Sequence, residues 1–318
     1  MTNAASVVPR VNRKRKPFLR QLHDYRYLLA MLLPAIAFFL VFYYAPMYGL
    51  VISFKRYDYA LGILHSPWNG LDNFQFLFRS GKLYTLLANT VLYNTAFIVV
   101  GMMFQIAVSI LLSEMNGRYF KKACQTALFL PYFISWVAVS AVVYNLLSYR
   151  YGFVNGILNS MGVKPINFYA KASYWPMILL IANTWKGLGY GTVVYMAAIA
   201  GIDAEIYEAA QIDGASVFQR IWNITLPNLI STMVTLLLLN IGGIFRGNFQ
   251  LFWSLVGSNN LLYKTTDVID TYVYRSLLTG SNFGMTSAAG LIQSVLCFAI
   301  ILAVNAFVKR ISPDNALF

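Results

Sequence analysis

The sequence has few charged residues and very few residues that do chemistry. Of its 318 residues only 11% are Asp, Glu, Lys or Arg, and it has two histidines and two cysteines. His23 and His65 lie outside the long apolar segments, and no pair of carboxylates lies within one. Because a catalytic site needs titratable groups close together, an integral-membrane enzyme is not expected. Cys124 and Cys297 lack the spacing of a metal site and are interpreted as packing residues.

The sequence also lacks the Gly-x4-Gly-Lys-Ser/Thr motif of ATP-binding P-loops. Such a loop cradles phosphates with its backbone amides and its lysine, so this chain is not expected to bind ATP in that way. We predict no cofactor and no metal in this chain, and any ATP-driven work must draw its energy from another subunit.

Apolar residues are what the sequence has in excess. They make up 58% of it, more than a soluble core can bury. Six apolar runs are each long enough to cross about 30 Å of hydrocarbon as a helix. We therefore predict an all-α integral membrane protein with six transmembrane helices, at about residues 27–54, 86–112, 123–147, 174–200, 229–245 and 285–308.

Positive charge near the two ends predicts the orientation. The first 26 residues carry seven lysines and arginines, and Lys309 and Arg310 follow the last run. The positive-inside rule and an even number of spans place both termini in the cytoplasm, N-in and C-in. The predicted parts are a basic arm at 1–26, a transmembrane domain at 27–308 and a tail at 309–318. The net charge of +13 is interpreted as topology and contact with membrane lipid, not as nucleic-acid binding.

A polar loop at about residues 201–228 separates the fourth and fifth predicted spans. Four of the chain's 11 acidic residues lie in it, namely Asp203, Glu205, Glu208 and Asp213. Cytoplasmic loops normally favour cations, so these acids indicate another role. Interleaved apolar residues suit two amphipathic helices that face the membrane domain or a docked partner.

Local signals set the expected ends of these two helices. Asp203 is predicted to cap the first helix and Gly214 to end it. Ser216 and Gln219 have the spacing of a capping box, which opens the second helix. Pro227 is predicted to end that helix before the fifth span.

The same loop contains Glu-Ala-Ala, three residues, Gly, nine residues, Ile, one residue and Leu-Pro. This pattern resembles the EAA loop in permease subunits of bacterial ATP-driven (ABC) importers. The preceding Ala-Ala-Ile-Ala-Gly-Ile resembles the carbohydrate-uptake, maltose-type branch. The segments that begin at Tyr44 and Trp68 resemble permeases for oligosaccharides from plant or algal polysaccharides.

The resemblance implies a multisubunit importer in the bacterial cytoplasmic (inner) membrane. Its expected partners are a second permease subunit, two ATPase subunits that bind ATP and magnesium, and an extracytoplasmic solute-binding protein that delivers the oligosaccharide. The first loop helix is expected to insert into a groove of the ATPase. The residues implied in ATPase coupling are Glu208, Ala209, Ala210, Asp213, Gly214, Ile224, Leu226 and Pro227.

Two polar stripes beside this loop are candidates for substrate binding. Asn183, Lys186, Gly187 and Tyr190 share one face of the fourth predicted helix, and Asn240, Gly243 and Gly247 have helical spacing in the fifth. The resemblance implies that such stripes bind the sugar. Alternatively, the glycines pack helices together and Asn240 bonds to a neighbouring helix.

Lys186 is the only charge deep within a predicted span. Facing lipid would cost at least about 2.5 kcal/mol, so a paired or lumen-facing lysine is expected. With Arg246 it suggests an acidic oligosaccharide, such as a uronate from alginate or pectin. The competing interpretation of the chain is an ion-coupled secondary sugar transporter, although such carriers usually place carboxylates within the membrane and none lies mid-span here.

Overall fold

The computed structural model describes residues 24–79, 81–115, 117–280 and 282–311. Within these ranges the chain is helical and has no β-strand, only one isolated antiparallel bridge between Lys55 and Trp68. The predicted all-α class is therefore confirmed. The chain divides into two compact units, residues 1–51 and 52–318. Most of the basic arm and residues 312–318 of the tail lie outside the described residues.

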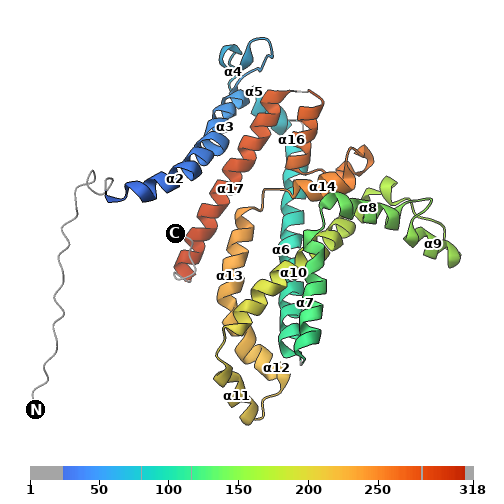
Figure 1. Ribbon diagram of the computed structural model, residues 1–318. Helices are drawn as coiled ribbons and strands as arrows, with labels where there is room; N and C mark the ends of the chain where they lie inside the picture. Colours follow the sequence, from blue (N-terminus) through green and yellow to red (C-terminus); the bar gives the residue numbers. More distant parts are fainter. Residues whose placement is uncertain (1–23, 80, 116, 281, 312–318) are drawn as a thin grey trace, which may run out of the picture. The chain divides into compact units, whose positions relative to one another are not determined.

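The first unit contains most of one long helical segment, drawn in blue in Figure 1, whose last residues belong to the second unit. It begins with α2 (Arg26–Phe39), continues through a π-helical turn (Leu40–Tyr44) and α3 (Ala45–Met47), and passes into a 3-10 turn (Tyr48–Phe54). No residue of α2 is buried. The apolar segment from Arg26 to Phe54 is long enough to span a membrane, and it matches the first predicted run.

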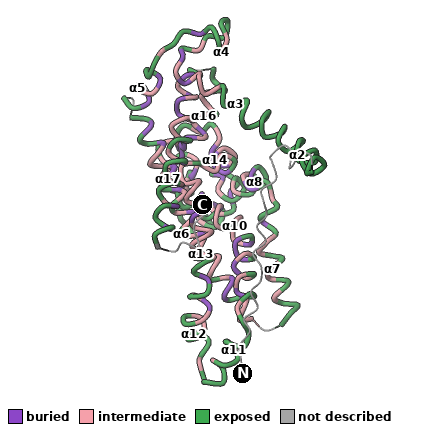
Figure 2. The backbone as a smooth tube through the Cα atoms, turned by 90° about the vertical axis from the view of Figure 1, so that its left-hand side faces the viewer, coloured by how far each residue is buried: buried purple, intermediate pink, exposed green. Residues whose placement is uncertain are grey.

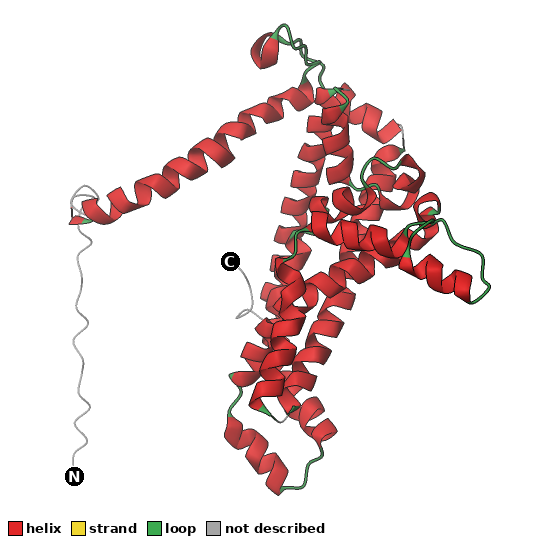
Figure 3. Ribbon diagram, turned by 45° about the vertical axis from the view of Figure 1, so that its right-hand side comes forward, coloured by secondary structure: helices red, strands yellow, loops and turns green. Residues whose placement is uncertain are grey.

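Four long helices of the second unit lie close to predicted runs, and Figures 1 and 3 show their course. They are α6 (Lys82–Glu114), α10 (Trp175–Ala200), α13 (Leu226–Gly242) and α17 (Phe283–Ile311). The helix α6 begins after Gly81, whose positive φ of 65° is accessible to glycine at little cost. Lys309 and Arg310 lie in the last turn of α17, where cations oppose the partial negative charge of the helix end.

The third predicted helix, at residues 123–147, is wrong as one continuous helix. The structure has α7 (Arg118–Phe133) and α8 (Trp136–Leu147), bent by 99° at the break between them. Pro131 cannot donate a backbone hydrogen bond, which weakens the end of α7. Ser135 then adopts an extended conformation and caps α8 by accepting a hydrogen bond from the amide of Ala138. The chain therefore bends sharply at residues 134–135, where the apolar run predicted one helix with Pro131 inside it.

Shorter helices connect these elements. They are α4 (Gly62–His65), α5 (Asp72–Arg79), α9 (Phe153–Ser160), α11 (Ala204–Ile212), α12 (Val217–Arg220), α14 (Phe249–Val256), α15 (Tyr263–Thr266) and α16 (Ile269–Leu278). Among the described residues, four helices are long and apolar enough to cross a membrane, and two bent pairs raise the number to as many as six.

Side-chain hydrogen bonds fold the connection between the first span and α6. The Lys55 side chain is buried and donates to the carbonyls of Ile63 and Leu64, both at 2.8 Å. The amide of Asn73 donates to the carbonyls of Ser53 and Lys55 at 2.9 and 3.0 Å. These side-chain bonds satisfy backbone carbonyl groups that have no partner within a regular helix.

The buried residues of the second unit, purple in Figure 2, include separate hydrophobic clusters. One cluster surrounds Trp175 and Phe252, where α6, α8, α10 and α14 meet. Another joins α6, α10 and α13 around Tyr195 and Leu229, close to the 201–228 loop. The helix α10 packs along both α6 and α7, so it lies at the centre of the unit.

Candidate functional site

The loop at residues 201–228 forms the two helices that its capping signals predict. Asp203 accepts a hydrogen bond from the amide of Glu205 at 3.0 Å and caps α11. Gly214 follows the end of α11 with φ of +76°. Ser216 and Gln219 form the predicted capping box at the start of α12. These local predictions are confirmed.

The predicted end of the second loop helix is wrong. The helix α12 does not stop at Pro227 but passes through a π-helical turn (Ile221–Thr225) directly into α13. Pro227 lies in the first turn of α13. Proline cannot donate to the carbonyl one turn before it, and a wider π turn accommodates that missing bond. The loop is therefore continuous with the helix that follows it.

The eight residues predicted for ATPase coupling fall into two groups. Glu208, Ala209, Ala210, Asp213 and Gly214 lie on α11 or at its end, and no residue of α11 is buried. Ile224, Leu226 and Pro227 lie in the π turn and at the start of α13. The first group presents an accessible helix, and Leu226 packs against the buried cluster around Tyr195.

A polar cavity lies where the corner between α7 and α8 faces α10 and the start of α14. We call it the lysine cavity. Its volume is about 430 Å³, and it is lined by Tyr132, Ile134, Ser135, Trp136, Asn183, Lys186, Gly187, Asn248 and Gln250. The lining combines amides, a hydroxyl, an ammonium group and aromatic rings, which suit a polyhydroxylated ligand.

Lys186 is paired, as expected for a lysine within a span. Its ammonium donates to the carbonyls of Pro131 and Tyr132 at 3.2 and 2.7 Å. It also lies 5.6 and 5.4 Å from the ring centroids of Tyr132 and Trp136, within the range of cation–π attraction. Carbonyls at the end of α7 carry partial negative charge, so Lys186 stabilises the corner between α7 and α8.

A second cavity, the α6 cavity, adjoins the lysine cavity and shares Asn183 and Asn248 with it. It has a volume of about 360 Å³ and is lined by Asn94, Phe97, Ile98, Gly101, Met102, Gln105, Asn183, Leu239, Asn240, Gly243 and Asn248. The two cavities together form a polar surface that extends from the lysine to α13.

The expected stripe on the fifth helix does not exist as a helix face. The helix α13 ends at Gly242, so Gly243 and Gly247 follow it in a loop. Asn240 lines the α6 cavity but donates its amide to the carbonyl of Leu236 in its own helix, at 2.7 Å. The backbone amide of Gly247 donates to Asp270 at 2.6 Å, and Gly247 lines neither cavity.

The fourth-helix stripe is brought together in α10. Asn183, Lys186 and Gly187 line the lysine cavity. Tyr190 does not line it, but its ring stacks on that of Tyr132, with centroids 5.1 Å apart and planes 15° apart. The aromatic pair therefore extends the cavity wall along the end of α7.

Tyr132, Ser135 and Trp136 were not predicted as site residues from the sequence. The break between α7 and α8 places them at the lysine cavity. Pro131 followed by Ser135 was the available signal, because proline and a capping serine together mark a helix boundary. Gln105 was also missed; its amide donates to the carbonyl of Gly187 at 3.3 Å.

Arg246 and Asp270 form a separate polar group beside the cavities. Asp270 accepts hydrogen bonds from the amide of Gly247 and from Gln293, at 2.6 and 3.0 Å. Burial raises the pKa of the Asp270 carboxyl, while these bonds and the nearby charge of Arg246 oppose that rise. Arg246 lines neither cavity, so only Lys186 of the two predicted cations lies on the cavity wall.

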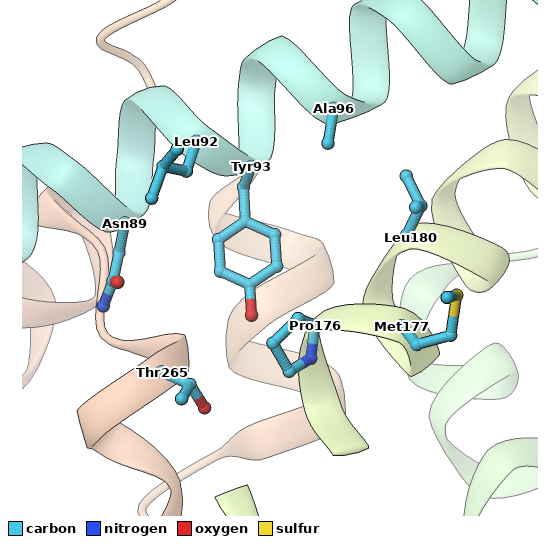
Figure 4. A pocket seen from close by; sticks show the side chains of 8 residues that line it. All are labelled: Asn89, Leu92, Tyr93, Ala96, Pro176, Met177, Leu180 and Thr265. Carbon is cyan, nitrogen blue, oxygen red and sulfur yellow. The ribbon is translucent and has the colours of Figure 1, made fainter. Parts of the chain in front are cut away.

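A third cavity has a different character (Figure 4). Asn89, Leu92, Tyr93 and Ala96 of α6 face Pro176, Met177 and Leu180 of α10, with Thr265 below them. Its volume is about 430 Å³. Most of these side chains are apolar, so it offers few donors and acceptors to a sugar.

The helical fold, the polar cavities and the exposed loop helix define a membrane permease. Residues 105–313, more than half of the chain, match the family of binding-protein-dependent transport system inner membrane components. The chain belongs to this family and is a multi-pass membrane protein. Its membership argues against the alternative of an ion-coupled secondary carrier.

Individual relatives agree with this assignment. The polygalacturonan/rhamnogalacturonan transport system permease protein YteP of Bacillus subtilis (strain 168) is 33% identical over 302 residues, which cover 95% of this chain and 94% of the relative. Protein LplB of the same organism is 32% identical over 290 residues, 91% of each chain.

A solved structure is also similar. It is a crystal structure of a bacterial ABC transporter involved in the import of the acidic polysaccharide alginate. The match has a TM-score of 0.85 and 34% sequence identity, and covers 93% of this chain and 100% of that chain. A second structure of the alginate transporter, in complex with an alginate pentasaccharide-bound periplasmic protein, matches with a TM-score of 0.84.

Proposed function

We propose that this chain is a permease subunit of an ATP-driven importer for acidic oligosaccharides, and that the sugar passes along the lysine cavity. The observation that carries the proposal is the lining of this cavity, where Lys186 stands among amides and aromatic rings. Amides bind sugar hydroxyls, and the rings of Tyr132 and Trp136 offer apolar planes to pyranose faces.

The charge of Lys186 supports an acidic substrate. A lysine ammonium has three hydrogens, and two of them serve the carbonyls of Pro131 and Tyr132. The third is available to a carboxylate in the cavity. One similar permease is named for polygalacturonan/rhamnogalacturonan transport, and one similar transporter is described as importing the acidic polysaccharide alginate. Polygalacturonan and alginate are polymers of uronic acids, and rhamnogalacturonan contains them. We therefore favour uronate oligosaccharides as the substrate class.

We further propose six spans with both termini in the cytoplasm, which places the 201–228 loop on the cytoplasmic side. The exposed helix α11, with Glu208 on its surface, would then dock in a groove of an ATPase subunit. The complete importer would contain a second permease, two ATPases that bind ATP and magnesium, and an extracytoplasmic solute-binding protein in the bacterial inner membrane. Substrate contact is proposed for Asn183, Lys186, Gly187, Asn240 and Gly243, with Tyr190 supporting the wall.

The substrate proposal is tested by uptake in a Lys186→Met variant, using trigalacturonate and its fully methyl-esterified form. These two ligands differ in charge but share the same sugar backbone. Loss of the bonds from Lys186 to the carbonyls of Pro131 and Tyr132 affects both ligands alike. A charge-assisted hydrogen bond is worth about 1.5–3 kcal/mol, so uptake of trigalacturonate should fall about 10- to 100-fold further than uptake of the ester. The control is Lys164→Met, because Lys164 is exposed in the segment between α9 and α10. Equal losses for both ligands would exclude charge recognition by Lys186.

The coupling proposal is tested with Glu208→Lys. This variant should still insert into the membrane but lose the ATPase subunit on purification in mild detergent, together with uptake. Glu205→Lys, which reverses an exposed charge in the first turn of the same helix, controls for the change in charge. Full ATPase binding and uptake by the Glu208→Lys transporter would refute this role.

A further inference from the structure

The end of α6 is joined to the 201–228 loop by an ion pair. Arg220, at the end of α12, donates from Nη2 to Oε2 of Glu114, the last residue of α6, at 3.3 Å. The two side chains are 12% and 28% exposed. Partial burial weakens screening by water and salt, so such a pair is stronger than one on an open surface.

The loop is also fixed to the start of α13. The Tyr207 hydroxyl of α11 shares a hydrogen bond of 2.8 Å with the hydroxyl of Thr225, which is 1% exposed in the π turn. Ile221 and Leu226 pack against the buried cluster around Tyr195 and Leu229. Since α11 and α12 are thus held to α6 on one side and to α13 on the other, they cannot move without displacing these helices.

The helix α6 leads from this ion pair to the cavities. Gln105, about two and a half turns before Glu114, donates to the carbonyl of Gly187. Asn94 donates to the carbonyls of Ile244 and Arg246 at 2.8 and 2.9 Å. The helix α6 therefore bonds to the 201–228 loop at its end, and along its length it bonds to α10 and to the segment after α13. Both of these elements also contribute residues to the α6 cavity.

We propose that Glu114 and Arg220 are positioning residues, and that their ion pair transmits a displacement of the 201–228 loop to α6 and thereby to the cavity walls. This inference rests on the proposed docking of α11 on an ATPase. It goes further, because it assigns the transmission of movement to a contact outside the docking helix. The two residues act through α6 and touch neither the ATPase nor the substrate in this role.

The test measures movement of α6 without depending on the substrate. Met102 lines the α6 cavity. In the complete transporter with Cys124 and Cys297 replaced by serine, a Met102→Cys variant is labelled with a water-soluble maleimide, with and without ATP and vanadate. The same measurement is made with Glu114→Gln, with Arg220→Gln, with both together, and with the control Lys122→Gln, which removes an exposed charge from α7.

Each single variant should reduce the nucleotide-driven change in labelling about fivefold, as expected for a loss of about 1 kcal/mol of coupling. The double variant should be no worse than either single one, because both substitutions remove the same interaction. Lys122→Gln should behave as the parent. The ATPase subunit should remain bound in all of them.

Two kinds of result would overturn the inference. The pair transmits nothing if the single variants keep the full nucleotide-driven change in labelling. The same conclusion follows if the double variant reduces this change by the product of the two single reductions. Loss of the ATPase from the Glu114 or Arg220 variants would assign the pair to docking instead. Failure of the parent protein to bind the ATPase is a separate outcome, because it would remove the proposed function itself.

Discussion

Replacing Gly189 by alanine tests how closely α10 must approach α7. A Cβ atom at this position would contact the carbonyl oxygen of Leu128 and would lie 2.6 Å from the Cα of Phe129. Carbon atoms normally pack at about 3.5–4.0 Å. Both atoms belong to the main chain of α7, which cannot rotate away as a side chain would. The two helices must therefore separate by about 1 Å.

The expected cost follows from three contributions. Overpacking costs about 1–3 kcal/mol, and the better helix propensity of alanine returns up to about 1 kcal/mol. Separation of the helices also stretches the 2.7 Å hydrogen bond from Lys186 to the carbonyl of Tyr132, and such a charge-assisted bond contributes about 1.5–3 kcal/mol. The expected net destabilisation is therefore about 1.5–6 kcal/mol.

The assay is thermal unfolding of the purified permease in detergent, followed by loss of the monodisperse peak. The apparent Tm of the Gly189→Ala variant should fall by on the order of 5–10 °C. The matched control is Gly290→Ala in α17, where an added Cβ meets nothing within 4 Å. Equal transition temperatures for the two variants would refute the claim that α7 and α10 are in main-chain contact.

Three further predictions concern parts of the chain outside this contact. Gly214→Val should reduce uptake more than Gly214→Asn, because φ of +76° suits Asn far better than a β-branched residue; similar uptake by both would contradict this. Burial raises the pKa of Asp270 in the folded state above its ordinary value of 3.8. The stability of the protein should therefore fall as the pH rises from about 3.8 through the raised pKa. Asp270→Asn should reduce this fall in stability in a thermal-shift titration. Asn155→Ala removes three hydrogen bonds that join Asn155 to Ser148 and Ile166, at a cost of about 2–3 kcal/mol of stability. Proteolysis between residues 148 and 166 should therefore be faster in this variant. The control is Asn159→Ala, because Asn159 is exposed.

Sequence patterns predicted the parts of the fold that depend on neighbours in the chain. The apolar runs gave α6, α10, α13 and α17 to within a few residues, since a long apolar segment in a membrane satisfies its backbone only as a helix. The caps at Asp203 and Ser216 were also predictable, because a capping side chain bonds to an amide two or three residues away.

The errors occurred where a local signal competed with the apolar pattern. No charged residue interrupts the apolar run from residue 123 to 147, so the run concealed the bend at Ser135. Pro227 was interpreted as a stop, although proline is tolerated in the first turn of a helix and the preceding π turn lets the chain continue. Helical spacing suggested one face for Asn240 and Gly247, but α13 ends at Gly242 between them.

The sequence by itself determined that this chain is a helical membrane protein and, through the Glu208 to Pro227 pattern, that it resembles ABC-importer permeases. Both conclusions depend on composition and short-range spacing. Only the tertiary structure decided which polar groups meet. Lys186 and Tyr132 lie 54 positions apart in the sequence, and Glu114 and Arg220 lie 106 positions apart. Their contacts depend on how helices bend and pack, which no periodicity within a single segment encodes.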